Sequence, residues 1–388
     1  MIAKSKKILI GITVGLVVTS STILGIILPG IVERQIPADS QLVIFTEDQN
    51  IAILNITSYK ELTNGKFKMA LSSVLNYYNI NSYLLLKIIS TKDNGDYISS
   101  CEVNSLDLEL GKNGFEIDLG HKKIDSIQGL AINVYYNSVD IAPTIYNALS
   151  LKNWYTQGQA FFTPEEHSIN KTIIILLDSF GWGFWDNLSN LGLIELEINP
   201  FIEQPALTVF PSITNVATAS ILTGYWPEVT GIMTRQNHQL EVPSIFDIAG
   251  ENNLTTEYIE GNVGFLNLEA DYEFWLTDQN ENDNIDDEIF DEAYESINDN
   301  RSDLLFVHFH GIDDIGHTYG PYSSEWMNKV NTTFSYVNDL IKIISNDTLV
   351  IITADHGMHL AFENDERVGI HGESRFEDMI IPLIFIKK

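Results

Sequence analysis

Five apolar segments between Lys171 and the C-terminus restrict the fold of this chain most strongly. They read KTIIILLD, LTTEYIEG, LLFVHFHGID, LVIITADHG and IIPLIFIKK, at residues 171–178, 254–261, 304–313, 349–357 and 380–388. Several are apolar throughout, which is typical of parallel strands that helices cover on both faces. Helical stretches lie between them, at 214–223, 244–252, 287–298 and 325–344. This alternation predicts an α/β fold with a doubly wound, mostly parallel sheet flanked by helices.

Polar residues follow these strands at the points where the strands end. In sheets of this kind, ligands gather at the carboxyl ends of the strands. Taken singly, each such residue is an ordinary turn or capping residue. Together they supply three carboxylates and three imidazoles, enough for two metal sites with nitrogen and oxygen ligands. These residues are Asp178, Asp313, His317, Asp355, His356 and His371.

Thr214 lies where a short β-rich run, LTVFP, turns into a helical run that ends near Gly224. Free backbone N–H groups and the positive end of the helix dipole favour an anion at such a position. A lone threonine there is usually only a helix cap. The metal-ligand pattern elsewhere in the chain favours a second interpretation, in which the Thr214 hydroxyl is a nucleophile directed at phosphorus.

The order of these motifs resembles the alkaline phosphatase superfamily. An Asp at a strand end, a Thr followed by T-G and P-x-x-x-G-I, then D-x-x-G-H, D-H-G-M and H-G occur in that order over residues 171–388. The nearest group is the nucleotide pyrophosphatase/phosphodiesterases, with the related phosphonoacetate hydrolases. The resemblance implies that Asp313, His317 and His371 hold one Zn²⁺, and that Asp178, Asp355 and His356 hold another. Mn²⁺ or iron are alternatives to zinc, and Thr214, bridging toward the second metal, would carry a phospho-threonine intermediate.

One position departs from the phosphodiesterase pattern. Members of that group carry a phosphate-binding Asn 21 residues after the nucleophile, and here that position is Arg235. Asn215, next to Thr214, could supply the amide instead. We therefore interpret Asn215 and Arg235 as candidate substrate-binding residues.

Three functions fit the resemblance. The first is a metal-dependent hydrolase of phosphodiesters or pyrophosphates, with a small phosphate ester or a nucleotide as substrate. The phrase HFHGIDDIGHTYGP is also similar to ethanolamine-phosphate transferases of lipid-anchor synthesis, which pass the phosphoryl group to a sugar. A catalytically idle surface binding protein on the same fold is the third. A sulfatase is disfavoured, because the chain has no Cys/Ser-x-Pro-x-Arg motif.

The N-terminus predicts a membrane anchor. Residues 1–7 carry three lysines, and residues 8–32 contain no charged side chain. That length exceeds the ~20 residues that span a bilayer. An uncleaved signal anchor is favoured over a cleaved signal peptide. The lysines place residues 1–7 in the cytoplasm and the catalytic domain outside the cell membrane.

The composition of the chain restricts its possible binding partners and the kind of metal site it can form. The formal net charge of −31 argues against binding to a nucleic-acid duplex. A single cysteine, Cys101, excludes an internal disulfide framework and a multi-cysteine zinc site.

The pattern of residues 36–125 predicts a separate β-rich or α+β module with a helix at 68–78. The sequence does not indicate a function for this module. We expect the catalytic domain to span 126–388. In the superfamily a segment similar to V-D-I-A-P-T-I-L follows the last strand, whereas here SVDIAPTIYNALSL occurs at 138–151. This segment fits two interpretations. One is an ordinary amphipathic linker helix, and the other, which we favour, is a circular permutation in which residues 126–165 fill the place of the missing C-terminal segment and GLAINVYY forms a strand near 380–388.

Overall fold

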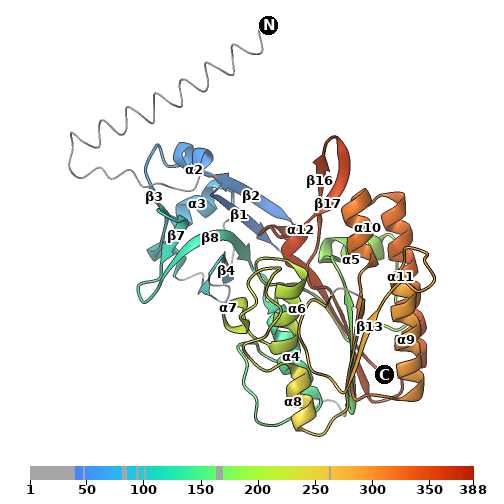
Figure 1. Cartoon of the computed structure of the whole chain (residues 1–388). Coiled ribbons are helices and arrows are strands. Elements are labelled where there is room, and N and C mark those ends of the chain that lie inside the picture. The colour runs from blue at the N-terminus through green and yellow to red at the C-terminus, as the bar shows by residue number, and fades with distance from the viewer. Residues whose placement is uncertain are drawn as a thin grey trace.

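The computed structural model describes residues 40–46, 49–80, 85–92, 96–99, 102–162, 169–261 and 264–388. Within them lie two eight-stranded sheets and the hairpin of β16 (His359–Glu363) and β17 (Glu366–Ile370) (Figure 1). No helix in these ranges has the length and apolar character needed to cross a membrane. The cytoplasmic tail and anchor expected at 1–32 lie outside the described residues, and both remain predictions.

The larger domain is built on a sheet with the strand order β13-β12-β14-β10-β15-β18-β11-β9. Its five strands from β13 to β15 run parallel, whereas β18 is antiparallel to both of its neighbours. The strands are β9 (Tyr136–Asn137), β10 (Lys171–Leu177), β11 (Ile202–Leu207), β12 (Thr256–Gly261), β13 (Tyr272–Leu276), β14 (Leu304–Phe309), β15 (Thr348–Thr353) and β18 (Ile380–Lys387).

Helices cover both faces of this sheet, as the apolar strands require (Figure 1). One face carries α4 (Ile141–Ala148), α6 (Thr214–Thr223) and α8 (Ile245–Glu251), with the short α7 (Pro227–Thr230) beside α6. The other carries α5 (Trp182–Asn190), α9 (Asp286–Asp299), α10 (Gly311–Tyr319) and α11 (Ser324–Ile343). Aromatic contacts such as Trp185 on Phe334 join α5 to α11. The predicted α/β architecture is therefore confirmed.

The smaller domain is a sheet ordered β2-β1-β8-β7-β6-β3, in which β4 also pairs with β8. Its helices, α2 and α3, bury one core of aliphatic and aromatic side chains. The elements are β1 (Gln41–Thr46), β2 (Asn50–Asn55), α2 (Ile56–Leu62), β3 (Lys68–Ala70), α3 (Leu71–Tyr77), β4 (Leu85–Ser90), β5 (Tyr97–Ser99), the 3₁₀ turn η1 (Val103–Ser105), β6 (Asp107–Gly111), β7 (Gly114–Asp118) and β8 (Lys123–Ile132). The helix expected at 68–78 is correct only from Leu71, because residues 68–70 pair with β6.

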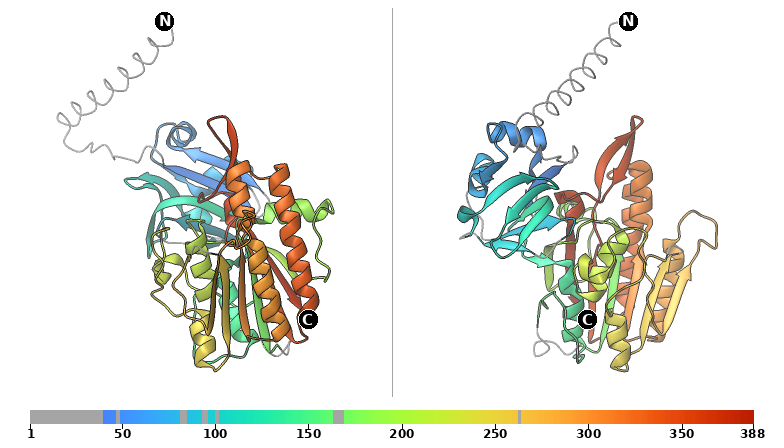
Figure 2. Two further views of the ribbon diagram at one scale, coloured as in Figure 1. Left: turned by 45° about the vertical axis from the view of Figure 1, so that its right-hand side comes forward. Right: turned by 60° about the vertical axis from the view of Figure 1, so that its left-hand side comes forward.

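The two domains meet at α12 (Phe376–Met379), where Figure 2 shows the first sheet against the larger domain. Phe45, Ala131 and Met379 belong to a shared apolar cluster there. Asn50 Nδ2 donates to Glu377 Oε2 at 2.6 Å, and Asn50 Oδ1 accepts from the Phe376 amide at 2.8 Å. The smaller domain therefore holds the segment that leads from the last loop into β18.

The chain crosses between the domains later than expected. Residues 123–132 form β8 and pair with β1, β4 and β7, so the boundary at 126 falls inside a strand of the first sheet. The expected strand of GLAINVYY (129–136) near 380–388 is wrong, since residues 129–132 belong to β8 and Tyr136 alone joins the second sheet, where it pairs with β11 and not with β18. The 3₁₀ turn η2 (Ser138–Asp140) and α4 pack on α6. The permutation itself remains a prediction.

A second difference concerns residues 310–313, which the apolar run assigns to a strand. In the structure β14 ends at Phe309 and α10 begins at Gly311. Asp286, in α9, accepts from the amides of His310 at 2.9 Å and Gly311 at 3.1 Å. This carboxylate satisfies the first free amides of α10, so the helix starts two residues before Asp313.

The close contact of Gly357 with the α12 segment can be tested by substitution. A Cβ on Gly357 would lie 1.9 Å from the Glu377 carbonyl oxygen and 3.0 Å from Gly181 Cα. We expect Gly357→Ala to lower the free energy of unfolding by about 2 kcal/mol, the usual size of an overpacking cost. Urea denaturation followed by tryptophan fluorescence measures it. Gly250→Ala is the control, because Gly250 lies in α8 with open space around it. Equal stability of the Gly357 variant and wild type would contradict the close contact.

Candidate metal centre

The six strand-end residues come together in two groups at the carboxyl ends of β10, β14 and β15. In the first group, His317 Nε2 lies 3.2 Å from Asp313 Oδ2, and His371 Nε2 lies 3.6 Å from Asp313 Oδ1. The two Nε2 atoms are 3.2 Å apart. All three residues are half-buried, so this group, which we call site 1, faces solvent on one side.

The second group, site 2, is fully enclosed. It consists of Asp178, Asp355 and His356, all buried. His356 Nε2 lies 3.2 Å from Asp355 Oδ2 and 3.7 Å from Asp178 Oδ1. The grouping of these residues agrees with the two ligand sets that the family resemblance implies. Their role as ligands remains a proposal.

The imidazoles of both sites share one hydrogen-bond arrangement. Each donates its Nδ1 proton to a backbone carbonyl, which leaves the Nε2 lone pair directed at the carboxylates of its site. Metal-ligating histidines are commonly oriented in this way. The acceptors are Gly369 O for His317 at 2.8 Å, Ser212 O for His371 at 2.9 Å and Gly357 O for His356 at 3.0 Å.

The carboxylates of site 2 fit a divalent cation. Asp178 Oδ1 and Asp355 Oδ2 are buried and accept no hydrogen bond within the described residues. Burial, followed by the charge of Asp313, raises the pKa of Asp178 to about 7. Burial and the charge of Asp178 raise the pKa of Asp355 well above its ordinary value. Unpaired buried carboxylates are costly unless a cation or a proton neutralises them.

The charges of site 1 are balanced differently. Burial alone would raise the pKa of Asp313, but its contact with His317 and the nearby His371 lower it well below the usual range. The contact with Asp313 raises the pKa of His317 to about 9, whereas burial lowers that of His371 to about 4. Site 1 therefore pairs one carboxylate with an imidazole and keeps a second imidazole neutral.

Thr214 is the first residue of α6 and lies beside site 2. Its Oγ1 is 3.3 Å from His356 Nε2, and 6% of the residue is exposed. The first amides of α6 have no acceptor within the helix. A phosphoryl group at Thr214 would therefore meet both a helix N-terminus and the metal ligands.

Ser179 joins the two sites and was not anticipated from the sequence. Its hydroxyl donates to Asp313 Oδ1, and its amide donates to Asp355 Oδ1 at 3.2 Å. It adopts a left-handed conformation with φ 60°. Such strain persists where the surroundings fix it, often at functional sites. Its position after Asp178 was the sole sequence signal.

Asn215 occupies a different role from the one expected. Its Nδ2 donates to the carbonyls of Thr234 at 2.7 Å and Asn237 at 2.8 Å, which uses both amide hydrogens. Asn215 thus holds the loop that carries Arg235 and does not present its amide to a phosphate. Arg235 is exposed, and its Nη2 lies 3.2 Å from His371 Nε2, at the open side of site 1.

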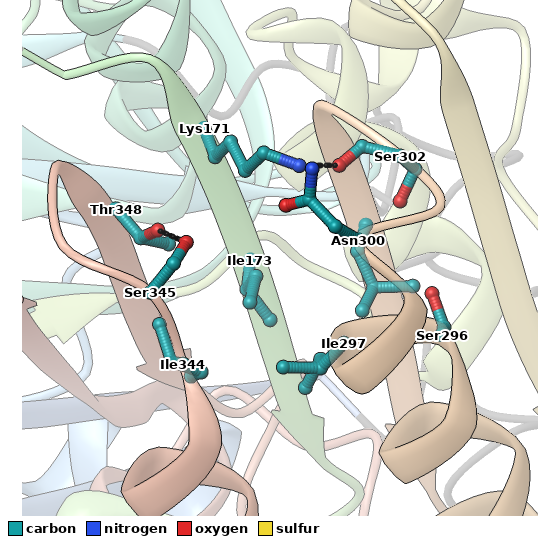
Figure 3. Close-up of a pocket in the computed structure, with 10 residues that line it drawn as sticks. Lys171, Ile173, Ser296, Ile297, Asn300, Ser302, Ile344, Ser345 and Thr348 are labelled. Atoms are coloured by element: carbon teal, nitrogen blue, oxygen red, sulfur yellow. Dashed lines mark hydrogen bonds between the residues drawn. The ribbon is translucent and has the colours of Figure 1, made fainter.

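The described residues that line a cavity at the opposite edge of the sheet offer no comparable group of ligands. A cavity of about 20 Å³ lies there, between the amino ends of β10 and β15 (Figure 3). Lys171 Nζ donates to Ser302 O at 2.9 Å beside it. Its remaining lining is serine, threonine, asparagine and aliphatic side chains, which lack a nucleophile with a base.

Comparison with known proteins finds a family match over about a third of the chain. Residues 255–374 match the model of the type I phosphodiesterase / nucleotide pyrophosphatase family. This confirms the resemblance to the alkaline phosphatase superfamily. Five of the seven predicted metal-centre residues fall within the matched range, which excludes Asp178 and Thr214.

Curated relatives share short stretches with this chain. The catalytic subunit of GPI ethanolamine phosphate transferase 3 of Homo sapiens is 33% identical over 76 residues, which are 20% of this chain and 7% of the relative. GPI ethanolamine phosphate transferase 1 of Candida glabrata is 38% identical over 85 residues, 21% of this chain and 8% of the relative. The matches therefore span under a tenth of the length of either relative.

Two solved structures are similar at low identity. Phosphonoacetate hydrolase of Sinorhizobium meliloti has a TM-score of 0.44 at 16% identity, over 55% of this chain and 62% of that chain. Murine ectonucleotide pyrophosphatase / phosphodiesterase 5 has a TM-score of 0.38 at 17% identity, over 50% and 58%.

The place of Arg235 at the open side of site 1 predicts an effect on substrate choice. A monoester carries more negative charge than a diester, and a guanidinium offers planar donors to phosphate oxygens. We expect Arg235→Asn to lower kcat/KM for a chromogenic monoester at least ~10-fold more than for the matching diester. Arg367→Asn, on the β16–β17 hairpin, is the control. An unchanged ratio of the two rates would make Arg235 an ordinary surface residue.

Proposed function

We propose that this chain cleaves phosphoric esters of the diester or pyrophosphate type, with Thr214 as the nucleophile and a small phosphate ester or nucleotide as substrate. The observation that carries the proposal is the position of Thr214 Oγ1, 3.3 Å from His356 Nε2 and at the start of α6. The family match supports the reaction class.

The donor sets of sites 1 and 2 fit two divalent cations. Each site offers imidazole nitrogen and carboxylate oxygen, which suits Zn²⁺ first, with Mn²⁺ and iron as alternatives. Asp313, His317 and His371 would hold one cation, and Asp178, Asp355 and His356 the other. When bound, such cations lower the pKa of a coordinated hydroxyl and stabilise the attacking and leaving oxygens.

The residues of this chain would carry out the displacement at phosphorus in two steps. Thr214 Oγ1 forms a bond to phosphorus as the bond from phosphorus to the leaving oxygen breaks, and the proton of the Thr214 hydroxyl passes to the leaving oxygen. The amides of the first turn of α6 bind the phosphoryl oxygens. The oxygen of an acceptor hydroxyl or water then attacks phosphorus from the solvent side, where site 1 is open. The bond from phosphorus to Thr214 Oγ1 breaks, and the proton that the acceptor loses passes to Thr214 Oγ1. In a hydrolase this acceptor is water.

A second candidate is transfer of the phosphoryl group to an alcohol. The observation that favours it is the shared name of the curated relatives, which are GPI ethanolamine phosphate transferases. A membrane anchor at 8–32 and an extracellular catalytic domain would suit either reaction, and both belong to this proposal.

Removal of the Thr214 hydroxyl tests the mechanism. We expect Thr214→Ala to lower kcat on a chromogenic phosphodiester at least ~10³-fold while metal content stays unchanged, because Asp178, Asp355 and His356 would still hold the cation of site 2. Thr218→Ala is the matched control, since Thr218 is buried in the same helix and its hydroxyl has no partner in the described residues. Turnover by Thr214→Ala at the rate of the control would rule out a covalent intermediate on this residue.

One assay distinguishes water from an alcohol as the acceptor of the phosphoryl group. The purified protein is given a chromogenic phosphodiester donor and increasing concentrations of a methyl glycoside, and the phosphorus products are counted by ³¹P NMR. A hydrolase should give the free phosphate ester whatever the glycoside concentration. A transferase should divert most of the product to the glycosyl phosphodiester, with Thr214→Ala abolishing both products. Hydrolysis alone at every concentration would exclude the second candidate for this class of acceptor.

A further inference from the structure

A cavity of about 360 Å³ adjoins the metal centre but is lined by none of the residues of site 1 or site 2. The first turn of α5, the loop after α10, the start of β16 and the α12 segment enclose it (Figure 1). Gly181 and Met358 of its wall lie three and two residues after Asp178 and His356. Cavities of roughly 300–1,000 Å³ with apolar walls and a few polar groups are the usual form of a small-molecule site.

Most of the wall is apolar. Phe184 of α5 contacts Tyr322 edge to face, with 5.3 Å between the ring centroids. Phe376 of α12 and Leu360 of β16 complete this part of the wall. Tyr322 and Leu360 are exposed although both are large and largely apolar. A ligand with an apolar body would cover this surface, which is favourable in water.

His359 places a hydrogen-bond acceptor in the same wall. It is 6% exposed, and its Nδ1 donates to Asp378 Oδ1 at 2.6 Å. The buried Asp378 is itself fixed, because its Oδ2 accepts from the Glu373 amide at 2.9 Å. In the neutral ring this arrangement leaves the lone pair of Nε2 as an acceptor. His359 Nε2 lies 3.8 Å from Glu373 Oε2 and has no hydrogen-bond partner within the described residues.

The charged groups around the cavity already have partners. Arg375 Nε and Nη2 donate to the Glu377 carboxylate at 2.9 and 3.2 Å, and Arg375 Nη1 lies 3.7 Å from Glu373 Oε2. At the rim, Arg367 Nη2 donates to the Pro321 carbonyl at 2.9 Å. A charged ligand would lose its hydration here without meeting an unpaired opposite charge, which is costly. The partial positive charge at the N-terminus of α5 is the one feature that favours an anion.

We propose that this cavity is a binding site for an uncharged alcohol with an apolar chain or ring, whose hydroxyl donates to His359 Nε2. The apolar wall takes the body of the ligand, the fixed imidazole selects a hydrogen-bond donor, and the paired charges exclude ions. The proposal goes beyond the proposed function and does not depend on it, since the site is tested by binding and not by turnover.

The test is binding of small probes to the purified full chain, measured by saturation-transfer NMR titration. The probes are 1-hexanol, its isomer 1-methoxypentane, hexanoate and hexylamine. The two isomers have the same atoms, but only 1-hexanol has a hydroxyl to donate. We expect 1-hexanol to bind at least ~3-fold more tightly than 1-methoxypentane, as one added hydrogen bond gives. It should bind at least ~10-fold more tightly than hexanoate or hexylamine, because both are charged at neutral pH.

Substitution of the wall locates the binding. Leu360→Asn should weaken 1-hexanol at least ~3-fold, because it replaces apolar contact by an amide. Leu191→Asn is the matched control, since Leu191 is an exposed leucine that lies outside the cavity. If Leu360→Asn does not fold by circular dichroism, Tyr322→Asn takes its place. Tyr322 is exposed and has φ 64°, a conformation that asparagine adopts readily.

Each outcome decides the proposal. Preference for 1-hexanol together with weaker binding by the wall variant, and not by the control, supports it. Equal affinities for the two isomers would show that His359 does not select a hydroxyl, and tighter binding of hexanoate or hexylamine would show that an ion is the ligand. Both results overturn the proposal. So does the absence of binding, or equal binding of 1-hexanol by the wall variant and the control, which would place the probe elsewhere on the protein.

Discussion

Repulsion between buried carboxylates is the constraint on which this centre depends. Asp178 and Asp355 each have an oxygen without a hydrogen bond within the described residues, and both belong to one group of atoms within 4.8 Å. Two like charges at that separation repel by about 3.5 kcal/mol at an effective dielectric constant of ~20. The fold tolerates this arrangement because each carboxylate is fixed by its strand and cannot turn away to solvent. The same rigidity makes the centre receptive to a compensating positive charge.

Parallel pairing explains why the donors meet in one place. β14, β10 and β15 lie side by side in register, so the turns that follow them emerge at the same edge of the sheet. Gly181 and Gly357 lack the Cβ atoms that would separate two of these turns. Asp286 starts α10 early, which places Asp313 and His317 on the first and second turns of a helix whose N-terminus points at the centre. The positions of site 1 and site 2 therefore depend on the order of the strands and on the close contact that Gly181 and Gly357 allow between the turns.

Most of the sheet domain could be predicted from the sequence, because apolar runs and the polar residues after them are local signals. The division of the six Asp and His residues into two groups came from the family resemblance, and the structure brings the same residues together, while their role as ligands stays a prediction. The helix at 214–223 was predicted with the observed bounds. The features that the sequence did not predict depend on contacts between residues far apart in the chain. Residues 310–313 became helical through a carboxylate contributed by α9, and the tasks of Asn215 and Ser179 depend on loops that meet only in the folded chain. Glu260 lies nearly fifty residues before His308, and no local pattern gave the register that sets them face to face.

The contact of Asn50 with the α12 segment ties the smaller domain to the metal centre by thermodynamic linkage. Asn50 holds Phe376 and Glu377, and Ser374 Oγ donates to Gln128 O in β8, within a few residues of His371. Any cation that requires His371 in place binds the docked form of the smaller domain more tightly than the undocked form. By reciprocity, loading of site 1 strengthens docking by the same factor. Within the described residues the smaller domain contributes no side chain to site 1 or site 2, so metal occupancy would affect its docking through the α12 segment.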